Sequence, residues 1–234
     1  MSERPNRRRR VATPGDVPRS VILLAAIGLV VLSVPLAGLL LDAPWGRLSA
    51  LLLTSETLTA ARVSLIVSLS AAALSVLIGV PAAFVLARTD FAGKAIVRTI
   101  VTVPLVLPPV VTGVALLSGF GRRGLLGSIT GWGLSASTLG AIVAATLVAM
   151  PFLILSVEGA LRTADPRYEE VAASFGARPF ARWWRVSLPM IRPAILAGAI
   201  LAWARALGEF GATITFAGNI EGVTRTLPLD VSIA

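Results

Sequence analysis

The chain contains no cysteine and no histidine, and only 14% of its 234 residues are charged. Without cysteine, a disulfide framework and a thiolate metal site are excluded. Without histidine, the chain lacks the commonest general base and the commonest metal ligand. We therefore expect no catalytic residue, no metal site and no cofactor in this chain.

The shortage of charge also limits the class of protein. A soluble domain of this length must cover its core with charged residues, whereas here 56% of the residues are hydrophobic and the mean hydropathy is +0.85. That composition indicates an integral membrane protein. The net charge of +9 does not point to nucleic acid, because the basic residues flank apolar runs instead of forming a stripe on a polar fold.

Five long apolar runs follow a basic tail at 1–20: 21–41, 58–87, 100–120, 138–157 and 194–216. Runs of this length in lipid are helices, because the backbone must satisfy its own hydrogen bonds. The first run is 21 residues long, which exceeds the apolar region of a signal peptide, and no cleavage-like site follows closely. We therefore predict an all-α, polytopic membrane protein with a retained first span.

The basic residues predict the orientation. With the N-terminus inside, the cytoplasmic segments 1–20, 88–99 and 158–193 carry fifteen basic residues, and the outer segments carry four. The positive-inside rule thus predicts a multi-pass protein of the cell membrane, with a cytoplasmic tail at 1–20 and a transmembrane domain at 21–234. No further full span fits after residue 216, so we expect either a missing sixth helix or an end on the outer side.

A dense polar segment at 169–189, EEVAASFGARPFARWWRVSLP, interrupts the apolar runs with five charged residues. Asp165 can cap a short helix that Gly176 would stop, and a second short helix would follow at about 180–187. Neither is long enough to span a bilayer. Two interpretations stay open: a helix pair on lipid headgroups with Trp183 and Trp184 in the aromatic belt, or a protein-docking element.

The residue order in this segment resembles the EAA motif of ABC importer permeases, Glu-Ala-Ala-x3-Gly-x9-Ile-x-Leu-Pro. The matching residues are Glu170, Ala172, Gly176, Leu188 and Pro189, and the departures are Val171 and Val186. The resemblance implies that the cytoplasmic loop 158–193 carries a coupling helix that docks on a separate ATPase subunit. That partner would bind ATP and Mg, since the chain has no G-x-x-x-x-G-K-[ST] motif.

Two features of the apolar runs point to a transport pathway or gate. Arg205 and Glu209 lie four residues apart, where they can pair on one helix face. An ionised residue near the bilayer centre costs about 2.5–3.5 kcal/mol, so we expect further partners from a neighbouring helix or subunit. The pair is either a polar gate or a structural lock between helices.

Three prolines in the third run, Pro104, Pro108 and Pro109, predict a bend. A helix broken in this way lines a cavity or packs against protein. We therefore take Pro108 and Pro109 as candidates for the pathway, with a static packing kink as the alternative.

The stretch RALGEFGA at 205–212 resembles permeases for tetrahedral oxyanions, and GNIEGVTRTLPL at 218–229 is most similar to the molybdate branch of that group. The resemblance covers about 57–229. It implies the MetI-like transmembrane domain of ABC transporters, in a homodimer with two ATPase subunits and an outer binding protein, periplasmic or a lipoprotein. Sulfate or thiosulfate is the alternative substrate.

Two other classes fit the residues less well. A membrane-embedded enzyme would need a cluster of ionisable groups, and the spans offer only Arg62, Arg98, Arg205 and Glu209. A non-transporting anchor or sensor would have no reason for the EAA spacing. The sequence therefore predicts a transporter subunit that is not itself an enzyme.

Overall fold

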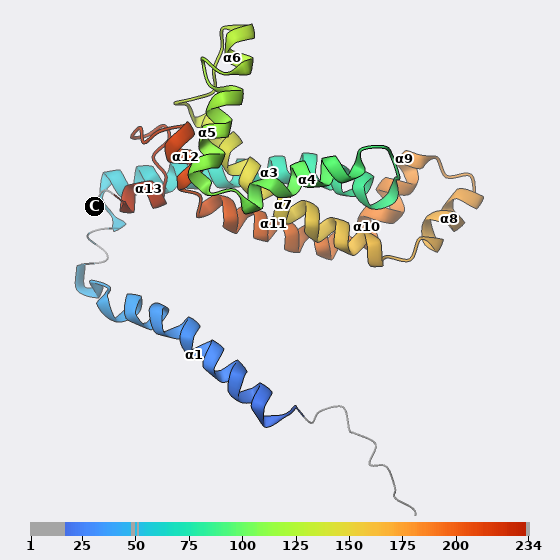
Figure 1. Cartoon of the computed structure of the whole chain (residues 1–234), viewed down its shortest axis with the longest axis horizontal. Helices are drawn as coiled ribbons and strands as arrows, with labels where there is room; N and C mark the ends of the chain where they lie inside the picture. The colour runs from blue at the N-terminus through green and yellow to red at the C-terminus, as the bar shows by residue number, and fades with distance from the viewer. Residues whose placement is uncertain (1–16, 48–49, 51, 233–234) are drawn as a thin grey trace, which may run out of the picture. The chain divides into compact units, whose positions relative to one another are not determined.

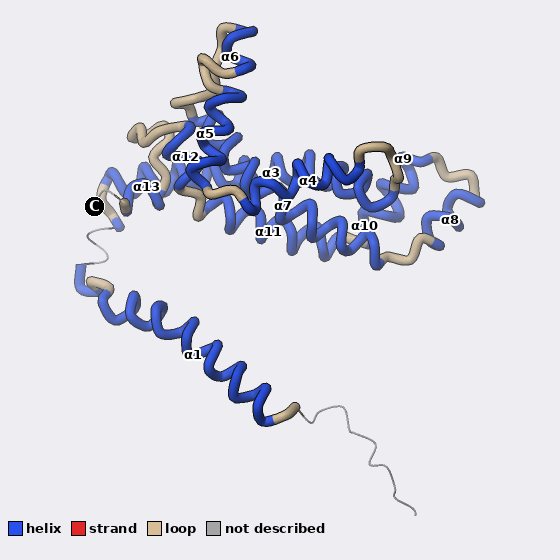
Figure 2. Tube along the Cα trace, in the orientation of Figure 1, coloured by secondary structure: helices blue, strands red, loops and turns tan. Residues whose placement is uncertain are grey.

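In the computed structural model, residues 17–47, 50 and 52–232 are described, and within these ranges the chain is helical with no strand (Figure 2). The predicted all-α class is confirmed. Contacts divide the chain into two compact units, 1–51 and 52–234. Most of the predicted basic tail, up to residue 16, lies outside the described residues.

The first unit contains α1 (Arg19–Asp42) and the short η1 (Trp45–Arg47). Helix α1 is 24 residues long with a mean hydropathy of 2.6, and its apolar residues lie on every side. In the middle of this helix, Ser33 donates its hydroxyl to the Leu29 carbonyl at 2.7 Å, so this polar group is satisfied within the helix. These are the properties of a membrane span.

The second unit is built on three helices packed side by side along their lengths: α3 (Ser55–Arg88), α7 (Thr138–Thr163) and α11 (Arg192–Leu207) (Figure 1). Alanine dominates their shared core, with Ala71, Ala83, Ala141, Ala145, Ala149 and Ala202 fully buried. Two glycines bring the backbones closer still, because a Cβ on Gly79 or Gly198 would press on Leu153 or Ser156 of α7. Small residues at helix contacts are typical of membrane bundles, whose helices associate through close packing.

Three of the five apolar runs are single helices long and apolar enough to cross a membrane: α1, α3 and α7. Pro81 and Pro151 lie inside α3 and α7 without ending them. A fourth candidate is the bent pair Pro179–Met190 and Arg192–Leu207, which meet at 73°. The predicted polytopic membrane class is confirmed.

The third run is broken into α4 (Lys94–Val106) and α5 (Pro109–Phe120). The bend expected from the prolines is therefore present, but the run is two helices and not one. Leu107 and Pro108 both adopt extended backbone, since each precedes a proline that disfavours helical geometry there. Helix α4 packs along α7, whereas α5 leads into α6 (Leu125–Thr130) and points away from the three-helix core (Figure 1).

The fifth run is also broken, and the prediction of one helix through 194–216 is wrong. Helix α11 ends at Leu207 and α12 (Gly211–Phe216) begins after a three-residue break. Helix α12 packs against α5, so the segments that follow the two breaks contact each other. The chain then continues to α13 (Leu227–Val231), where the Leu227 amide donates to the Ser64 hydroxyl of α3 at 2.7 Å.

The predicted short helices between α7 and α11 are present. They are α8 (Arg167–Ser174), α9 (Pro179–Arg182), the π-helical η2 (Trp183–Ser187) and α10 (Leu188–Met190). Together these elements, residues 167–190, form the coupling hairpin, which extends beyond one end of the long helices (Figure 1).

Candidate functional site

The first arm of the coupling hairpin is α8, whose two ends are closed by hydrogen bonds. The Asp165 carboxylate accepts the Arg167 amide at 2.9 Å at the start of α8. At the other end, Gly176 has a φ of +80°, a left-handed conformation that glycine adopts without strain. The Ala177 and Gly176 amides bond back to the Ala172 and Ala173 carbonyls, which is the Schellman arrangement of a helix end.

The tip of α8 is exposed and apolar. Phe175 is 86% exposed, and Tyr168 and Val171 are also mostly exposed. Glu170 lies on the same short helix, and its carboxylate makes no hydrogen bond or ion pair within the described part of the chain. Large apolar side chains on an otherwise polar segment mark a surface that a partner covers.

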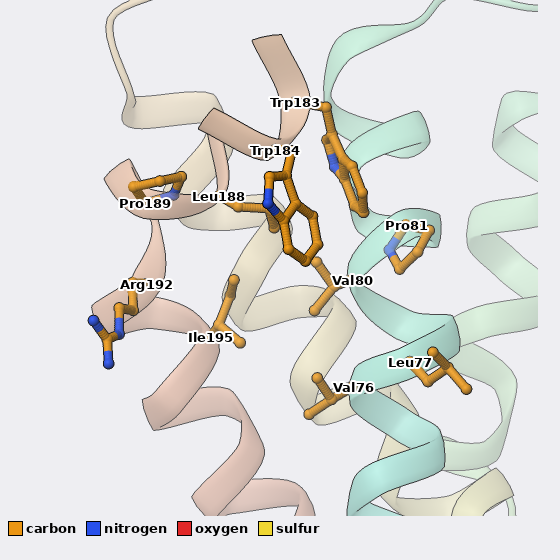
Figure 3. A pocket seen from close by; sticks show the side chains of 10 residues that line it. All are labelled: Val76, Leu77, Val80, Pro81, Trp183, Trp184, Leu188, Pro189, Arg192 and Ile195. Carbon is orange, nitrogen blue, oxygen red and sulfur yellow. The ribbon is translucent and has the colours of Figure 1, made fainter. Parts of the chain in front are cut away.

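The structure separates the predicted coupling residues into two groups. Glu170, Ala172 and Gly176 lie together on α8 and its end, whereas Leu188 and Pro189 lie in α10 at the base of the hairpin. The base borders an apolar groove of about 580 Å³ between α3 and the start of α11 (Figure 3). The groove is lined by Val76, Leu77, Val80, Pro81, Trp183, Trp184, Leu188, Pro189, Arg192 and Ile195.

Tandem tryptophans line this groove, and Trp183 lies beside α3 (Figure 3). Trp183 packs edge-on against Phe84 of α3, with ring centroids 6.4 Å apart, while Trp184 is mostly exposed. The lipid-interface and docking interpretations of this segment both stay open, and the structure offers a different part of the segment for each. The aromatic base suits a membrane interface, and the α8 tip suits a protein partner.

Two glutamates that sequence reasoning did not single out hold this end of the unit together. Glu158 of α7 is buried and accepts from Arg98 of α4 and from Arg162 one turn later, at 2.9 Å. Glu169 of α8 lies 3.1 Å from Arg88 of α3. No partner for these arginines is predicted from the sequence, although the four-residue spacing of Glu158 and Arg162 is a signal for an ion pair.

The loop between α3 and α4 carries one more ion pair. Lys94 donates to the Asp90 carboxylate at 2.9 Å, and this hydrogen bond lowers the pKa of Asp90 below its usual value. The Asp90 carboxyl is fully exposed, so the pair is solvated and adds little to stability.

At the other end of the core, the two broken runs pack at very short range. A Cβ on Gly113 of α5 would lie 2.5 Å from the Thr215 Cβ, and one on Gly211 would lie 2.6 Å from the Pro109 Cβ. Only glycine permits these approaches. Non-helical backbone within apolar runs is tolerated where it is buried in protein or lines a cavity.

The predicted Arg205–Glu209 pair is confirmed, with Nη1 and Oε2 2.6 Å apart. Glu209 is only 2% exposed, and it lies beyond the end of α11, so the two residues do not share one helix face as expected. The further partner comes from the chain itself: Glu209 Oε1 accepts the Ala212 amide at 2.8 Å. The carboxylate therefore joins the guanidinium to the first turn of α12 across the break.

These groups surround one small pocket of about 290 Å³. Its lining includes Pro109, Arg205 and Glu209, three of the four predicted pathway residues, together with Gly208 and Gly211. Pro108 lies in the adjacent break. The structure thus brings together a partly exposed guanidinium, a buried carboxylate and two helix breaks.

The fold and these features define a polytopic helical membrane protein with broken spans and a projecting hairpin, the class of a membrane permease. The family model described as "Binding-protein-dependent transport system inner membrane component" matches residues 75–232. The chain belongs to this family.

Relatives with curated descriptions agree with this assignment. The chain is 47% identical over 221 residues to the "Molybdenum transport system permease protein ModB" of Mycobacterium tuberculosis, covering 93% of this chain and 84% of that protein. It is 40% identical over 182 residues to the protein of the same description in Escherichia coli K12, covering 76% and 80%. The "Sulfate transport system permease protein CysW" of Synechocystis is 36% identical over 176 residues, covering 74% and 64%.

Proposed function

We propose that this chain is the permease subunit of an ABC importer for a tetrahedral oxyanion, and that the anion is molybdate. The observation that carries the class is the coupling hairpin, a stiff projection with an exposed apolar tip at the EAA spacing. The choice of molybdate is supported by the relatives described as molybdenum permeases, at 47% and 40% identity. Sulfate is the second candidate, on the relative described as a sulfate permease at 36% identity.

The proposed ATPase partner is supported by the hairpin, and the other proposed partners are supported by membership of the permease family. A separate ATPase subunit, which binds ATP and Mg, receives α8 in a cleft, with Val171 and Phe175 as apolar anchors. The permease works as a homodimer, and an outer binding protein delivers the anion. The N-terminus and the hairpin lie in the cytoplasm, as the distribution of basic residues indicates.

The pathway runs past the two helix breaks. Arg205 is partly exposed and offers a guanidinium to a passing anion, while Glu209 offsets most of its charge. A transport site must bind strongly enough for entry and weakly enough for release, and an arginine paired with a buried carboxylate meets both needs. Backbone breaks beside this pair allow the lining to change shape between inward- and outward-open states.

The proposal is tested by reconstitution in liposomes with the ATPase and the binding protein of the same transport system. We expect molybdate to stimulate ATP hydrolysis and to accumulate in the lumen, with sulfate much less effective. If sulfate is imported and molybdate is not, the substrate is wrong and the class stands. If neither anion stimulates hydrolysis, the importer function is refuted.

The orientation of the chain in the membrane is tested separately, by labelling single introduced cysteines. The chain has no cysteine of its own that would react with the label. Single cysteines at Ala173 in α8 and at Ser128 in α6 are exposed positions at the two ends. In intact cells a membrane-impermeant maleimide should label position 128 and reach position 173 only after permeabilisation. The reverse pattern would contradict the cytoplasmic placement of the hairpin.

A further inference from the structure

We propose that Glu169 is a positioning residue that fixes the coupling hairpin to the end of α3, while its neighbour Glu170 is left for the partner subunit. Displacement of α8 then reaches α3 directly, in addition to passing along the chain into α7 and α11. The coupling role rests on the proposed function, whereas the structural role of Glu169 does not.

The Glu169 carboxylate joins three segments. Its Oε1 accepts the Ser187 hydroxyl of η2 at 3.0 Å and lies 3.1 Å from Nη2 of Arg88, in the last turn of α3. Ser187 is fully buried, and the Arg88 and Glu169 side chains are only 17% and 18% exposed. Limited contact with solvent weakens screening, so this pair is stronger than an exposed surface pair.

A second contact lies on the same face of α3. Phe84 is one turn before Arg88 and packs against Trp183 in the other arm of the hairpin. Helix α3 therefore holds the α8 arm through charge and the η2 arm through an aromatic ring. The backbone of α8 packs mainly on α9 and η2, and the Glu169 side chain adds an ion pair that joins α8 to α3.

The two adjacent glutamates have opposite surroundings. Successive residues point about 100° apart around a helix, so Glu169 faces the bundle and Glu170 faces away from it. Glu170 is exposed, and its carboxylate makes no hydrogen bond or ion pair within residues 52–232. A charge without an internal partner is free to pair with another subunit, and a charge already paired inside is not.

The contact between Arg88 and Glu169 is an ion pair without the alignment of a hydrogen bond. Nη2 is within ion-pair distance of Glu169 but makes no aligned hydrogen bond, and Nε has no acceptor in the described part of the chain. Lysine at position 88 would keep the positive charge that pairs with Glu169. Glutamine at 169 would instead leave a largely buried guanidinium unpaired, which is destabilising.

The structural part is tested with spin labels at Ala173→Cys in α8 and Val85→Cys in α3, both at exposed positions. Labelled chains are diluted with unlabelled ones so that each dimer carries one labelled copy. Glu169→Gln should broaden the distance distribution measured by pulsed electron spin resonance. Arg88→Lys and Glu170→Gln should leave it narrow, and the exchange Arg88→Glu with Glu169→Arg should narrow it again.

The coupling part is tested on the complex with its ATPase. Glu169→Gln should lower the anion transported per ATP hydrolysed by about fivefold or more, a loss of the size of typical coupling energies, while the ATPase still binds. Glu170→Gln should weaken ATPase binding instead.

The results separate the two proposals. If Glu169→Gln keeps a narrow distance distribution and normal transport per ATP, Glu169 does not position the hairpin. The same conclusion follows if the broadened distribution is not narrowed again by exchanging the charges at positions 88 and 169. If the unaltered complex shows no anion-stimulated hydrolysis, the proposed function fails, and the spin-label distances still decide whether Glu169 fixes the hairpin.

Discussion

The contact between the two broken runs depends on a missing methyl group at Gly113. An alanine there would place its Cβ 2.5 Å from the Thr215 Cβ and 3.0 Å from the Ala212 carbonyl oxygen. Neither atom can rotate away, because one is the first carbon of a side chain and the other is backbone. Gly119, six residues later on α5, has nothing within 4 Å of the same position and provides a matched control.

Gly113→Ala and Gly119→Ala share the gain in helix propensity, and only Gly113→Ala carries a cost of overpacking. Alanine is favoured over glycine within a helix by about 0.5–1 kcal/mol, and this gain applies to both. Only Gly113→Ala also overpacks the contact, at a cost of about 1–3 kcal/mol. Since the shared gain cancels, the difference in stability between the two variants measures the overpacking alone.

Thermal unfolding in detergent, followed by tryptophan fluorescence, measures this difference. For a chain of this length 1 kcal/mol shifts the melting temperature by about 2–4 °C, so Gly113→Ala should melt at least about 2 °C below Gly119→Ala. Molybdate uptake should fall in Gly113→Ala, because α5 and α12 are forced apart, and remain in Gly119→Ala. Equal melting temperatures would refute the argument that this contact requires glycine.

Three further outcomes follow from the buried charges and the hairpin. Arg205→Gln should lower the melting temperature more than Glu209→Gln, because it leaves a buried carboxylate unpaired, and the double variant should recover much of the loss. If uptake remains lost in a recovered double variant, the pair acts in transport and not only in packing. Glu158→Gln should cost about 1 kcal/mol, seen as a lower melting temperature, since two partly exposed guanidiniums lose their shared carboxylate. Gly176→Ala should strain the end of α8 by about 1 kcal/mol and speed tryptic cleavage of the folded protein at Arg178.

The helices were largely predictable because in lipid each apolar run must form its own hydrogen bonds. The end of α8 was predictable too, since Gly176 is a local signal for a left-handed residue. The break after Leu207 was not. Arg205 and Glu209 have the spacing of a continuous helix, and only the folded chain shows Glu209 turning to the amide of Ala212.

The ion pairs at the hairpin end were missed for a related reason. Arginines near span ends carry an orientation signal whether or not they are paired, so counting them says nothing of their partners. Glu169 meets Arg88 across 81 positions of sequence, because α3 and the hairpin are neighbours only in the fold. The sequence showed that a polar segment was present, but not which of two adjacent glutamates faced inward.

The two ends of the second unit differ in what their contacts allow. At the hairpin end, an ion pair and an aromatic contact join α3 to the hairpin, and a second ion pair joins α4 to α7. Helices α3 and α7 continue there without a break. At the other end, backbone hydrogen bonds are interrupted at Leu107–Pro108 and between Leu207 and Gly211. Continuous helices transmit displacement, whereas residues outside regular helices absorb changes in backbone angle.

A displacement of the hairpin should therefore change the shape of the chain mainly at the two breaks, where Arg205 and Glu209 lie. Since Gly113 and Gly211 hold α5 and α12 together, we expect these two helices to move as a pair.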